Sequence, residues 1–450
     1  MTDCNREPLT FSSLGPRRLV ADFLGGRLTS DAGALLLREA GRATGLFEAL
    51  DAAIPDPRDP ARTTHDQRAM IAQRVVAIAL GYEDLNDHLT LRVDPALQVA
   101  AGAAPDADAP LASPSTLCRL ENRVDRRALI RIAAALVDQF IASHATPPGH
   151  LILDFDATDD PVHGRQQGRS FHGYYDNYCF LPLYVFCGDE LLTAYLRPSK
   201  IDASKHSRAL LKLLVRRLRQ AWPGVRITIR ADSGFCRWRL MRWCDSHGIG
   251  YVLGLARNPA LQRLAADWIG QAERRFKQSA QPQRVFGSFA YAASSWDRPR
   301  RVIVKGEHTA QGPNPRFVVV NVPGDPRELY EEVYCQRGEM ENRIKEQQLD
   351  LFADRTSCHD FLANQFRLLL SSAAYVLFQA LRRTVLRGTD LERAQVGTIR
   401  LKLLKVAARV VVSARRVVFH LASSYPYVER FTAVFHRVMN PAMPGRVGIG

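Results

Sequence analysis

Three acidic residues, Asp156, Asp232 and Glu341, have the side chains and the local settings to bind divalent cations. The first two end apolar runs that alternate like β-strands, and the third lies in a segment with helical composition. Carboxylates in such runs are costly to bury unless a cation or a hydrogen-bond donor meets them. We therefore regard the three residues as candidate metal ligands and candidate catalytic groups.

The first acid, Asp156, belongs to the run LILDFDATDD. In the predicted strand 151–157, Leu151, Leu153 and Phe155 fall on one face, and Ile152, Asp154 and Asp156 fall on the other. A solvated strand end is the alternative, although the run is mostly apolar. Asp154 is thus a candidate supporting residue, whereas Asp159 and Asp160 follow the strand and are expected to be surface acids.

The second acid, Asp232, follows the alternating run VRITIRA and precedes Ser233 and Gly234. It lands at the carboxyl end of a predicted strand, where ligands usually bind in sheets with helical crossovers. An ordinary Asp-Ser-Gly turn is equally consistent with this segment taken alone.

The third acid lies in the segment 327–350, which lacks proline, is rich in Glu, Arg and Gln, and is predicted to be a helix. Tyr334, Arg337, Glu341 and Lys345 fall on one stripe beside an apolar ridge, so the helix can dock on a core and present the stripe at its edge. A solvated face with weak i,i±4 ion pairs around the glutamate is the alternative.

Together these segments resemble the DDE transposases of bacterial insertion sequences (DDE domain group 1), whose catalytic core is ribonuclease-H-like. The resemblance covers about residues 150–385. Asp156-Ala157-Thr158 matches the first Asp of the family, which is followed by a small residue and Thr. Asp232 matches the second Asp, which follows a strand.

The third part of the resemblance is the signature Tyr-x2-Arg-x3-Glu-x6-Lys. Tyr334, Arg337 and Glu341 match it, but Gln348 stands where the Lys is expected. Lys345, one turn earlier on the same stripe, is the candidate substitute. The run Glu-Asn-Arg-Ile-Lys also matches the variant signature Glu-Asn-x-Ile-Lys of one subgroup.

The resemblance implies metal-dependent DNA cleavage at element ends followed by strand transfer. It makes the three acids the ligands of two Mg²⁺ ions, for which Mn²⁺ is expected to substitute. The expected partners are double-stranded DNA, in the form of terminal inverted repeats and target DNA, and a second copy of the chain in a DNA-bound homodimer. Phosphate contacts are expected from the signature helix, at Tyr334, Arg337 and Lys345.

Composition agrees with a nucleic-acid partner without requiring one. The chain has 450 residues, 46% of them hydrophobic, which suits a soluble protein of two or three domains. Its 61 Lys and Arg against 46 Asp and Glu give a formal charge of +15, which favours a polyanionic partner. A basic ribosome-associated protein, or one coded by high-GC DNA, is the alternative.

We expect a cytoplasmic protein without a membrane span. The start of the chain lacks an apolar signal core, and the longest mainly apolar stretch, 368–381, is too short and contains polar residues. The eight cysteines form no Cys-x2-Cys pair, so we expect reduced thiols rather than a zinc site or a disulfide framework.

The expected fold class is α/β, with a ribonuclease-H-like mixed sheet flanked by helices. Its core strands and helices are predicted at 151–157, 179–187, 191–197, 204–220 (helix), 225–231, 236–247 (helix) and 249–255. The expected domains are a helical, DNA-end-binding region 1–148, the first part of the core 149–256, a β-rich insertion 257–326, the Glu helix and the next helix of the core 327–385, and a basic helical tail 386–450.

Three further features carry weaker predictions of DNA contact. Arg119 and Arg123 lie on a basic predicted helix, 115–131, although an ordinary surface helix is the commoner case. Trp296 of the insertion either stacks on an unpaired base or joins a small core. The basic stretch from 381 onward either contacts DNA or packs its apolar side and solvates its arginines.

Two rival functions fit parts of the sequence. Asp154-Phe155-Asp156-Ala157-Thr158 also fits the Asp-x-Asp-x-Thr signature of haloacid-dehalogenase-like phosphatases, with Asp154 as nucleophile and Asp156 as acid/base. That family would assign no role to Tyr334, Arg337 and Glu341 of the signature helix. A catalytically inactive, transposase-derived DNA-binding protein is disfavoured because all three acids are present.

Overall fold

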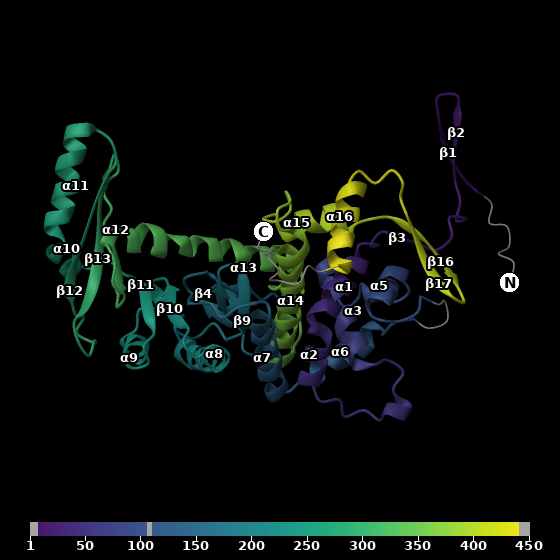
Figure 1. Ribbon diagram of the computed structural model, residues 1–450, viewed down its shortest axis with the longest axis horizontal. Helices are drawn as coiled ribbons and strands as arrows, with labels where there is room; N and C mark the ends of the chain where they lie inside the picture. Colours follow the sequence, from purple (N-terminus) through teal and green to yellow (C-terminus); the bar gives the residue numbers. More distant parts are fainter. Residues whose placement is uncertain (1–7, 106–109, 441–450) are drawn as a thin grey trace, which may run out of the picture. The chain divides into compact units, whose positions relative to one another are not determined.

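A nine-stranded mixed sheet occupies the centre of the compact unit formed by Asn122–Gln379, called the sheet unit below. The computed structural model describes residues 8–105 and 110–440 (Figure 1). The strand order is β12-β13-β15-β11-β10-β4-β8-β9, with β14 beside β13. The bounds are β4 His150–Ala157, β8 Leu183–Cys187, β9 Glu190–Tyr195, β10 Arg226–Ala231, β11 Gly250–Leu255, β12 Gln283–Tyr291, β13 Arg300–Thr309, β14 Gly312–Pro313 and β15 Arg316–Val320.

The strands β4, β10 and β11 are parallel to one another, and the other pairs of this sheet are antiparallel. Parallel strands require crossover connections, and helices α8 Ser207–Ala221 and α9 Trp238–Ser246 supply them. Strand alternation gives the sheet two different faces. One face packs Leu153 and Ile229 into the main core with α8 and α9.

The opposite face of the sheet carries Asp154 and Arg230, and farther along it packs Val252 and Val318 against the helical run that follows β15. Because side chains alternate with a period of two, Asp156 and Asp232 belong to this same face. The remaining helices of the sheet unit are α7 Arg126–Ala142, α10 Pro259–Leu264, α11 Ala266–Ser279 and α14 Phe361–Leu381, the last of which ends in the other unit.

The helix predicted at 327–350 is a continuous helical run of changing pitch. It comprises α12 Pro326–Glu328, the π-helical η3 Leu329–Tyr334, the 3₁₀-helical η4 Cys335–Arg337 and α13 Gly338–Leu351 (Figure 1). The Nη1 of Arg230 donates to the Val333 carbonyl at 2.6 Å, which draws that carbonyl out of the regular helical ladder. The prediction of a helix is confirmed, and the contact with Arg230 lies within its π-helical part.

The strand predicted at 179–187 is divided in two, as β7 Asn177–Phe180 and β8. Pro182 lies at the break, because proline cannot donate to a strand ladder. β7 instead lies between β5 Asp160–Pro161 and β6 Ser170–His172 in a small three-stranded sheet.

The region 257–326, expected to be a β-rich insertion, begins with the helices α10 and α11, and its strands extend the main sheet. β15 pairs with β11 antiparallel, so the chain from β12 to β15 adds strands to the core rather than forming a sheet of its own. Helix α11 packs closely on β12, where the ideal Cβ of a side chain at Gly287 would lie 2.0 Å from Trp268 Nε1. Trp296 is half-buried against Tyr291.

The second compact unit, called the helical unit, combines the described parts of Met1–Glu121 and Ala380–Met443. Its helices are α1 Ala34–Thr44, α2 Leu46–Ala53, η1 Pro60–Arg62, α3 Gln67–Leu80, α4 His88–Leu91, α5 Pro95–Ala100, most of α6 Pro114–Arg123, η5 Arg382–Leu386, α15 Val396–Ile399, η6 Arg400–Leu404 and α16 Val428–Met439. The segment 386–450 was expected to be a basic helical tail, and its described part belongs to the same compact unit as the N-terminal helices.

The helical unit also contains strands where helix was expected. β1 Leu9–Leu14 pairs with β2 Arg17–Ala21, and β16 Ala408–Ser413 lies between β17 Arg416–Leu421 and β3 Leu28–Thr29. In the tail, the β-branched valines of the run RVVVSARRVVF favour strands, and the turn at Ala414 and Arg415 closes the hairpin.

One helical stretch among the described residues, Phe361–Leu386, is long and apolar enough to cross a membrane. Its most apolar window is 89% buried within the fold. Such burial is typical of a core helix, and Phe366, Tyr375 and Phe378 are among the largest fully buried side chains.

Candidate active site

The first two acids lie on neighbouring parallel strands. Arg230 of β10 pairs in register with Asp154 of β4, so the same offset sets Asp232 beside Asp156, just beyond the last paired residues. Adjacent strands are about 4.8 Å apart, which makes these two carboxylates neighbours at the carboxyl edge of the sheet. Asp232 caps the short helix η2 Ser233–Phe235 and accepts from Gly234 N–H at 2.8 Å.

The third acid approaches from the helical run that covers this face of the sheet. The guanidinium of Arg337 is 2.8 Å from Glu341 Oε1 and 3.7 Å from Asp156 Oδ2. Arg337 therefore contacts both the signature glutamate and the first strand acid.

The electrostatic setting of Asp156 is unusual for a carboxyl group. Its side chain is only 16% exposed. Burial raises the pKa of Asp156 to about 7, with further upward contributions from Asp232 and Glu341 and an opposing one from Arg337. Asp156 thus lies where a nearby cation would strongly favour its charged form.

Asp154, expected to support the site, is engaged in a buried ion pair. Both of its oxygens accept from Arg230, with Nη2 to Oδ2 at 2.7 Å, and Asp154 is 2% exposed. Arg230 also bonds the helical run through the Val333 carbonyl. Asp154 and Arg230 therefore tie β4 and β10 to the helix that carries Glu341. An arginine inside an otherwise apolar strand was the available sequence signal for Arg230.

Gly254 of β11 is a second residue that the sequence interpretation overlooked. An ideal Cβ at this position would be 2.5 Å from the Tyr334 hydroxyl and 2.9 Å from the Ser233 nitrogen. Only glycine therefore allows Tyr334 to lie against the backbone that follows Asp232. No local sequence signal identifies Gly254, because the contact joins β11 to a segment 80 residues later.

The signature position without lysine has a structural contact. Gln348 Nε2 donates to the Asp159 backbone carbonyl at 3.0 Å, and this bond ties α13 to the chain that follows β4. Lys345 is exposed on α13.

Asp160 was expected to be a surface acid, but it is fully buried because it pairs within the small sheet. Its carboxylate accepts from the Thr356 hydroxyl at 3.2 Å. Burial raises its pKa well above the usual value.

The basic helix predicted at 115–131 is two helices, α6 and α7, because Asp125 caps a new helix start. Arg119 is exposed and donates to Thr116 on its own helix at 3.0 Å. Arg123 ends α6 and is half-buried. Neither residue has a described contact with the strand acids.

The three acids have the ligand atoms that a divalent ion prefers, but in this structure they are not arranged around one position. Asp156, Asp232 and Glu341 offer only oxygens, which Mg²⁺ and Mn²⁺ prefer. Within the described residues, however, no three His, Cys, Asp or Glu side chains are gathered closely enough to hold a metal ion. The Arg337 guanidinium occupies the position of a cation between Asp156 and Glu341.

Comparison with known proteins identifies the family. The family model described as transposase DDE domain group 1 matches residues 11–442. No curated protein sequence matches the chain. Among solved structures, the chain is similar to piggyBac transposase in a cryo-EM synaptic complex with hairpin DNA, with a TM-score of 0.40 and 12% identity over 94% of this chain and 88% of that one. The chain belongs to the DDE domain group 1 transposases and is an enzyme of DNA transposition.

Proposed function

We propose that Asp156, Asp232 and Glu341 are the catalytic carboxylates of this transposase. The observation that carries the proposal is the register of β4 and β10, which makes two of the acids neighbours, together with the Arg337 contacts that bring the third to the same edge. The surrounding core, about 150–385, is proposed to be ribonuclease-H-like.

DDE transposases generally use divalent metal ions. We propose that Asp156, Asp232 and Glu341 would hold two Mg²⁺ ions, replaceable by Mn²⁺. Two such ions would supply a nucleophilic water, neutralise the phosphate charge and stabilise the leaving oxygen. The all-oxygen donor set supports this assignment.

The side chains around the acids have separate tasks. Glu341 is paired with Arg337 in the fold, and with a cation held by Glu341 that guanidinium would be free to hold a DNA phosphate bidentately. Tyr334 is proposed to contact the DNA beside Arg337. Lys345, exposed one turn beyond Glu341, is proposed to grip phosphate in place of the missing signature lysine.

The reaction proposed is hydrolysis at the element ends, followed by in-line attack of the freed 3′-hydroxyl on target DNA. The partners are then double-stranded terminal inverted repeats and target DNA, and the paired ends call for a homodimer in the DNA complex. The net charge of +15 supports a polyanionic substrate. We place the reaction in the cytoplasm and assign auxiliary DNA contacts to Arg119 and Arg123.

The first test is cleavage of a plasmid that carries the gene's own flanking DNA, with Mg²⁺ or Mn²⁺. Wild-type protein should break the flanks at defined positions, and Glu341→Gln should reduce cleavage at least a thousandfold without weakening DNA binding. Glu339→Gln, the same change at an exposed position of the same helix, is the matched control. Retained cleavage by Glu341→Gln would remove Glu341 from the mechanism.

A second test separates the transposase from the phosphatase alternative. A nucleophilic Asp154 would need a free oxygen, whereas both of its oxygens are held by Arg230. Asp154→Asn should destabilise the sheet unit by about 3–5 kcal/mol, because it leaves Arg230 buried without its partner. Phosphatase activity that depends on Asp154 and is unaffected by Glu341→Gln would instead establish the alternative.

A further inference from the structure

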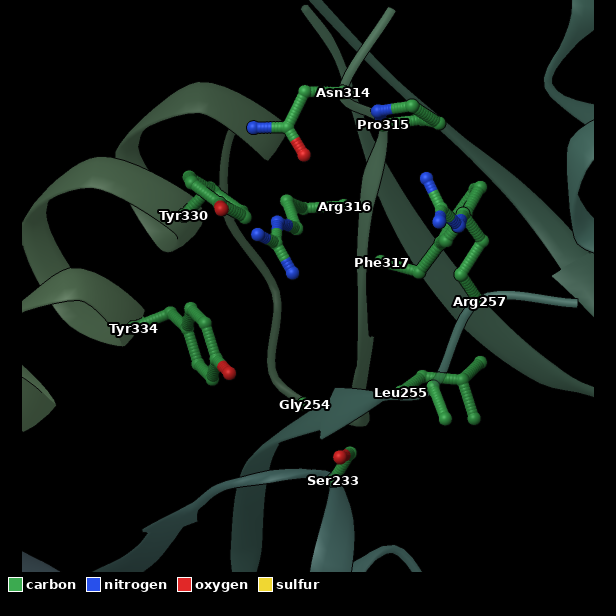
Figure 2. Close-up of a pocket in the computed structure, with 11 residues that line it drawn as sticks. Ser233, Gly254, Leu255, Arg257, Asn314, Pro315, Arg316, Phe317, Tyr330 and Tyr334 are labelled. Atoms are coloured by element: carbon green, nitrogen blue, oxygen red, sulfur yellow. The ribbon is translucent and has the colours of Figure 1, made fainter.

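A polar pocket lies beside the catalytic carboxylates and is not used by the mechanism above. Its volume is about 390 Å³, within the range of pockets that bind small ligands. Figure 2 shows the side chains of Tyr330, Tyr334 and Arg316 turned toward one another above Ser233 and Gly254. The polar and backbone groups that matter for binding come from Ser233, Gly254, Arg257, Asn314, Arg316 and Tyr334.

The strand order sets this pocket in line with the acids. Along the sheet, β4 with Asp156 is followed by β10 with Asp232, then by β11 and β15. Arg257 follows the carboxyl end of β11, and Arg316 begins the antiparallel β15, so both lie at the same sheet edge. At about 4.8 Å per strand, Arg316 is about 10 Å from Asp232 along that edge.

The pocket carries positive charge without a compensating acid. Within the described residues, neither Arg257 nor Arg316 has an ion pair or a side-chain hydrogen bond, and both are exposed. Asn314 donates to Glu307 at 2.9 Å, but that carboxylate is already engaged by Lys305 and by an arginine of β12. An anion in the pocket would therefore meet two guanidinium groups.

Single exposed arginines are common on protein surfaces and usually only solvated. Here two of them line one pocket, and Ser233 of that pocket directly follows the catalytic Asp232. Arginine is suited to phosphate because its planar donors match the phosphate oxygens.

We propose that this pocket binds a backbone phosphate of the DNA strand whose scissile phosphate lies at the carboxylates, with Arg257 and Arg316 as its contacts. The inference rests on the proposed function and names a further substrate subsite for it. The axial rise of roughly 3.4 Å per nucleotide is the lower limit of the phosphate spacing along a strand, so a distance of about 10 Å corresponds to about one to three nucleotides from the cleaved bond.

The first experiment measures DNA binding without metal, so that catalysis plays no part. The probe is a fluorescein-labelled duplex of the gene's flanking DNA, followed by anisotropy over a range of salt concentrations. Arg257→Gln combined with Arg316→Gln should weaken binding about tenfold and lower the slope of log K against log salt by about 1, because one phosphate contact is lost. Arg274→Gln combined with Arg275→Gln, an equal charge change at exposed positions of α11, is the matched control and should lower the slope less.

The second experiment locates the phosphate. Single neutral methylphosphonates are placed within five nucleotides of the cleaved bond, at the positions found with the plasmid. Wild-type protein should lose affinity at one phosphate about one to three nucleotides away. The Arg257 and Arg316 double variant should be indifferent to that change while remaining sensitive at other positions. The single variants provide the same comparison if the double variant is poorly folded.

The subsite would be overturned if the double variant and the α11 control gave the same affinity, the same salt slope and the same response to the methylphosphonates. That result leaves the proposed function intact as long as wild-type protein cleaves the flanks and Glu341→Gln does not. Failure of wild-type protein to cleave the flanks concerns the proposed function instead.

Discussion

Arg337 determines the charge balance of the proposed active site. Its guanidinium is 2.8 Å from Glu341 and 3.7 Å from Asp156, and it partly compensates the repulsion among the three acids. Compensation is incomplete, because the pKa of Asp156 is still raised to about 7 by burial. A site in this state gains stability from a cation and is destabilised by its own charged carboxylates.

This imbalance predicts that Asp156 lowers the free energy of unfolding of the metal-free protein to an extent that depends on pH. Its pKa is about 3.9 in the unfolded chain and about 7 in the fold, so the folded state binds more protons between these values. Raising the pH from 4 to 7 should therefore reduce stability. Asp156→Asn should be more stable than wild type by about 1–3 kcal/mol at pH 7.5, and the difference should vanish near pH 4.

Urea unfolding of both proteins at several pH values in EDTA measures this difference. Asp138→Asn, which alters a partly exposed acid of α7 that pairs with Arg217, controls for the change in net charge. A constant difference between wild type and Asp156→Asn from pH 4 to 7.5 would contradict the proposed state of the carboxyl group.

At the level of secondary structure, the active site depends on how two strands and one helical run are joined. The buried pair of Asp154 and Arg230 links β4 to β10, and Arg230 also bonds the π-helical segment η3. Gly254 allows Tyr334 to approach the end of β10. These contacts hold the helix that carries Glu341 over the edge where the strand acids end.

Gly254→Ala should disturb this arrangement without touching any acid. The new methyl group would lie closer than 3.0 Å to the Tyr334 hydroxyl and to a backbone nitrogen, so the helical run must shift. We expect a stability loss of about 1–3 kcal/mol and a cleavage rate reduced about 10- to 100-fold.

Single-turnover cleavage and urea unfolding check the expectation for Gly254→Ala. Gly149→Ala is the matched control, because nothing lies within 4 Å of its ideal Cβ. Tyr334→Phe added to Gly254→Ala should recover part of the lost stability, since it removes the hydroxyl from the closest contact. An unchanged cleavage rate in Gly254→Ala would show that the position of Tyr334 is not critical.

At the scale of the whole molecule, the helical unit has its own stability determinants. Arg74 and Glu121 form a fully buried ion pair with a 3.1 Å separation, and His88 lies beside it, 3.0 Å from Gln73. Burial lowers the pKa of His88 to about 3, with a further contribution from Arg74. The imidazole is therefore neutral in the fold.

The helical unit should consequently be sensitive to acid. The unfolded chain protonates His88 near pH 6.5, whereas the folded chain does not until about pH 3, so stability falls as the pH drops between these values. Between pH 6.5 and pH 5, His88 should lower the free energy of unfolding of the helical unit by about 2 kcal/mol.

Urea dependence of hydrogen exchange in α3 reports on this unit separately from the sheet unit. His88→Gln should lose most of the pH dependence between 6.5 and 5, even if it is less stable throughout. His247→Gln, at an exposed position, should behave as wild type. Equal pH dependence in all three proteins would remove His88 as the cause.

Local patterns in the sequence were sufficient to identify the elements that carry the acids. Alternation predicted β4 and β10, and composition predicted a helical run around Glu341, because these properties depend on neighbouring residues. They failed where a single residue acts on the backbone, as at Pro182, and where β-branched runs form strands late in the chain.

The tertiary structure decided which of these elements meet. The bond from Arg230 to Val333, the closeness of Gly254 to Tyr334 and the pocket of Arg257 and Arg316 all depend on the order β15-β11-β10-β4. The types and spacing of the three acids were readable from the chain itself. Their assembly was not, because strand order and register are set by long-range packing, and a slip of one residue would move an acid to the opposite face of the sheet.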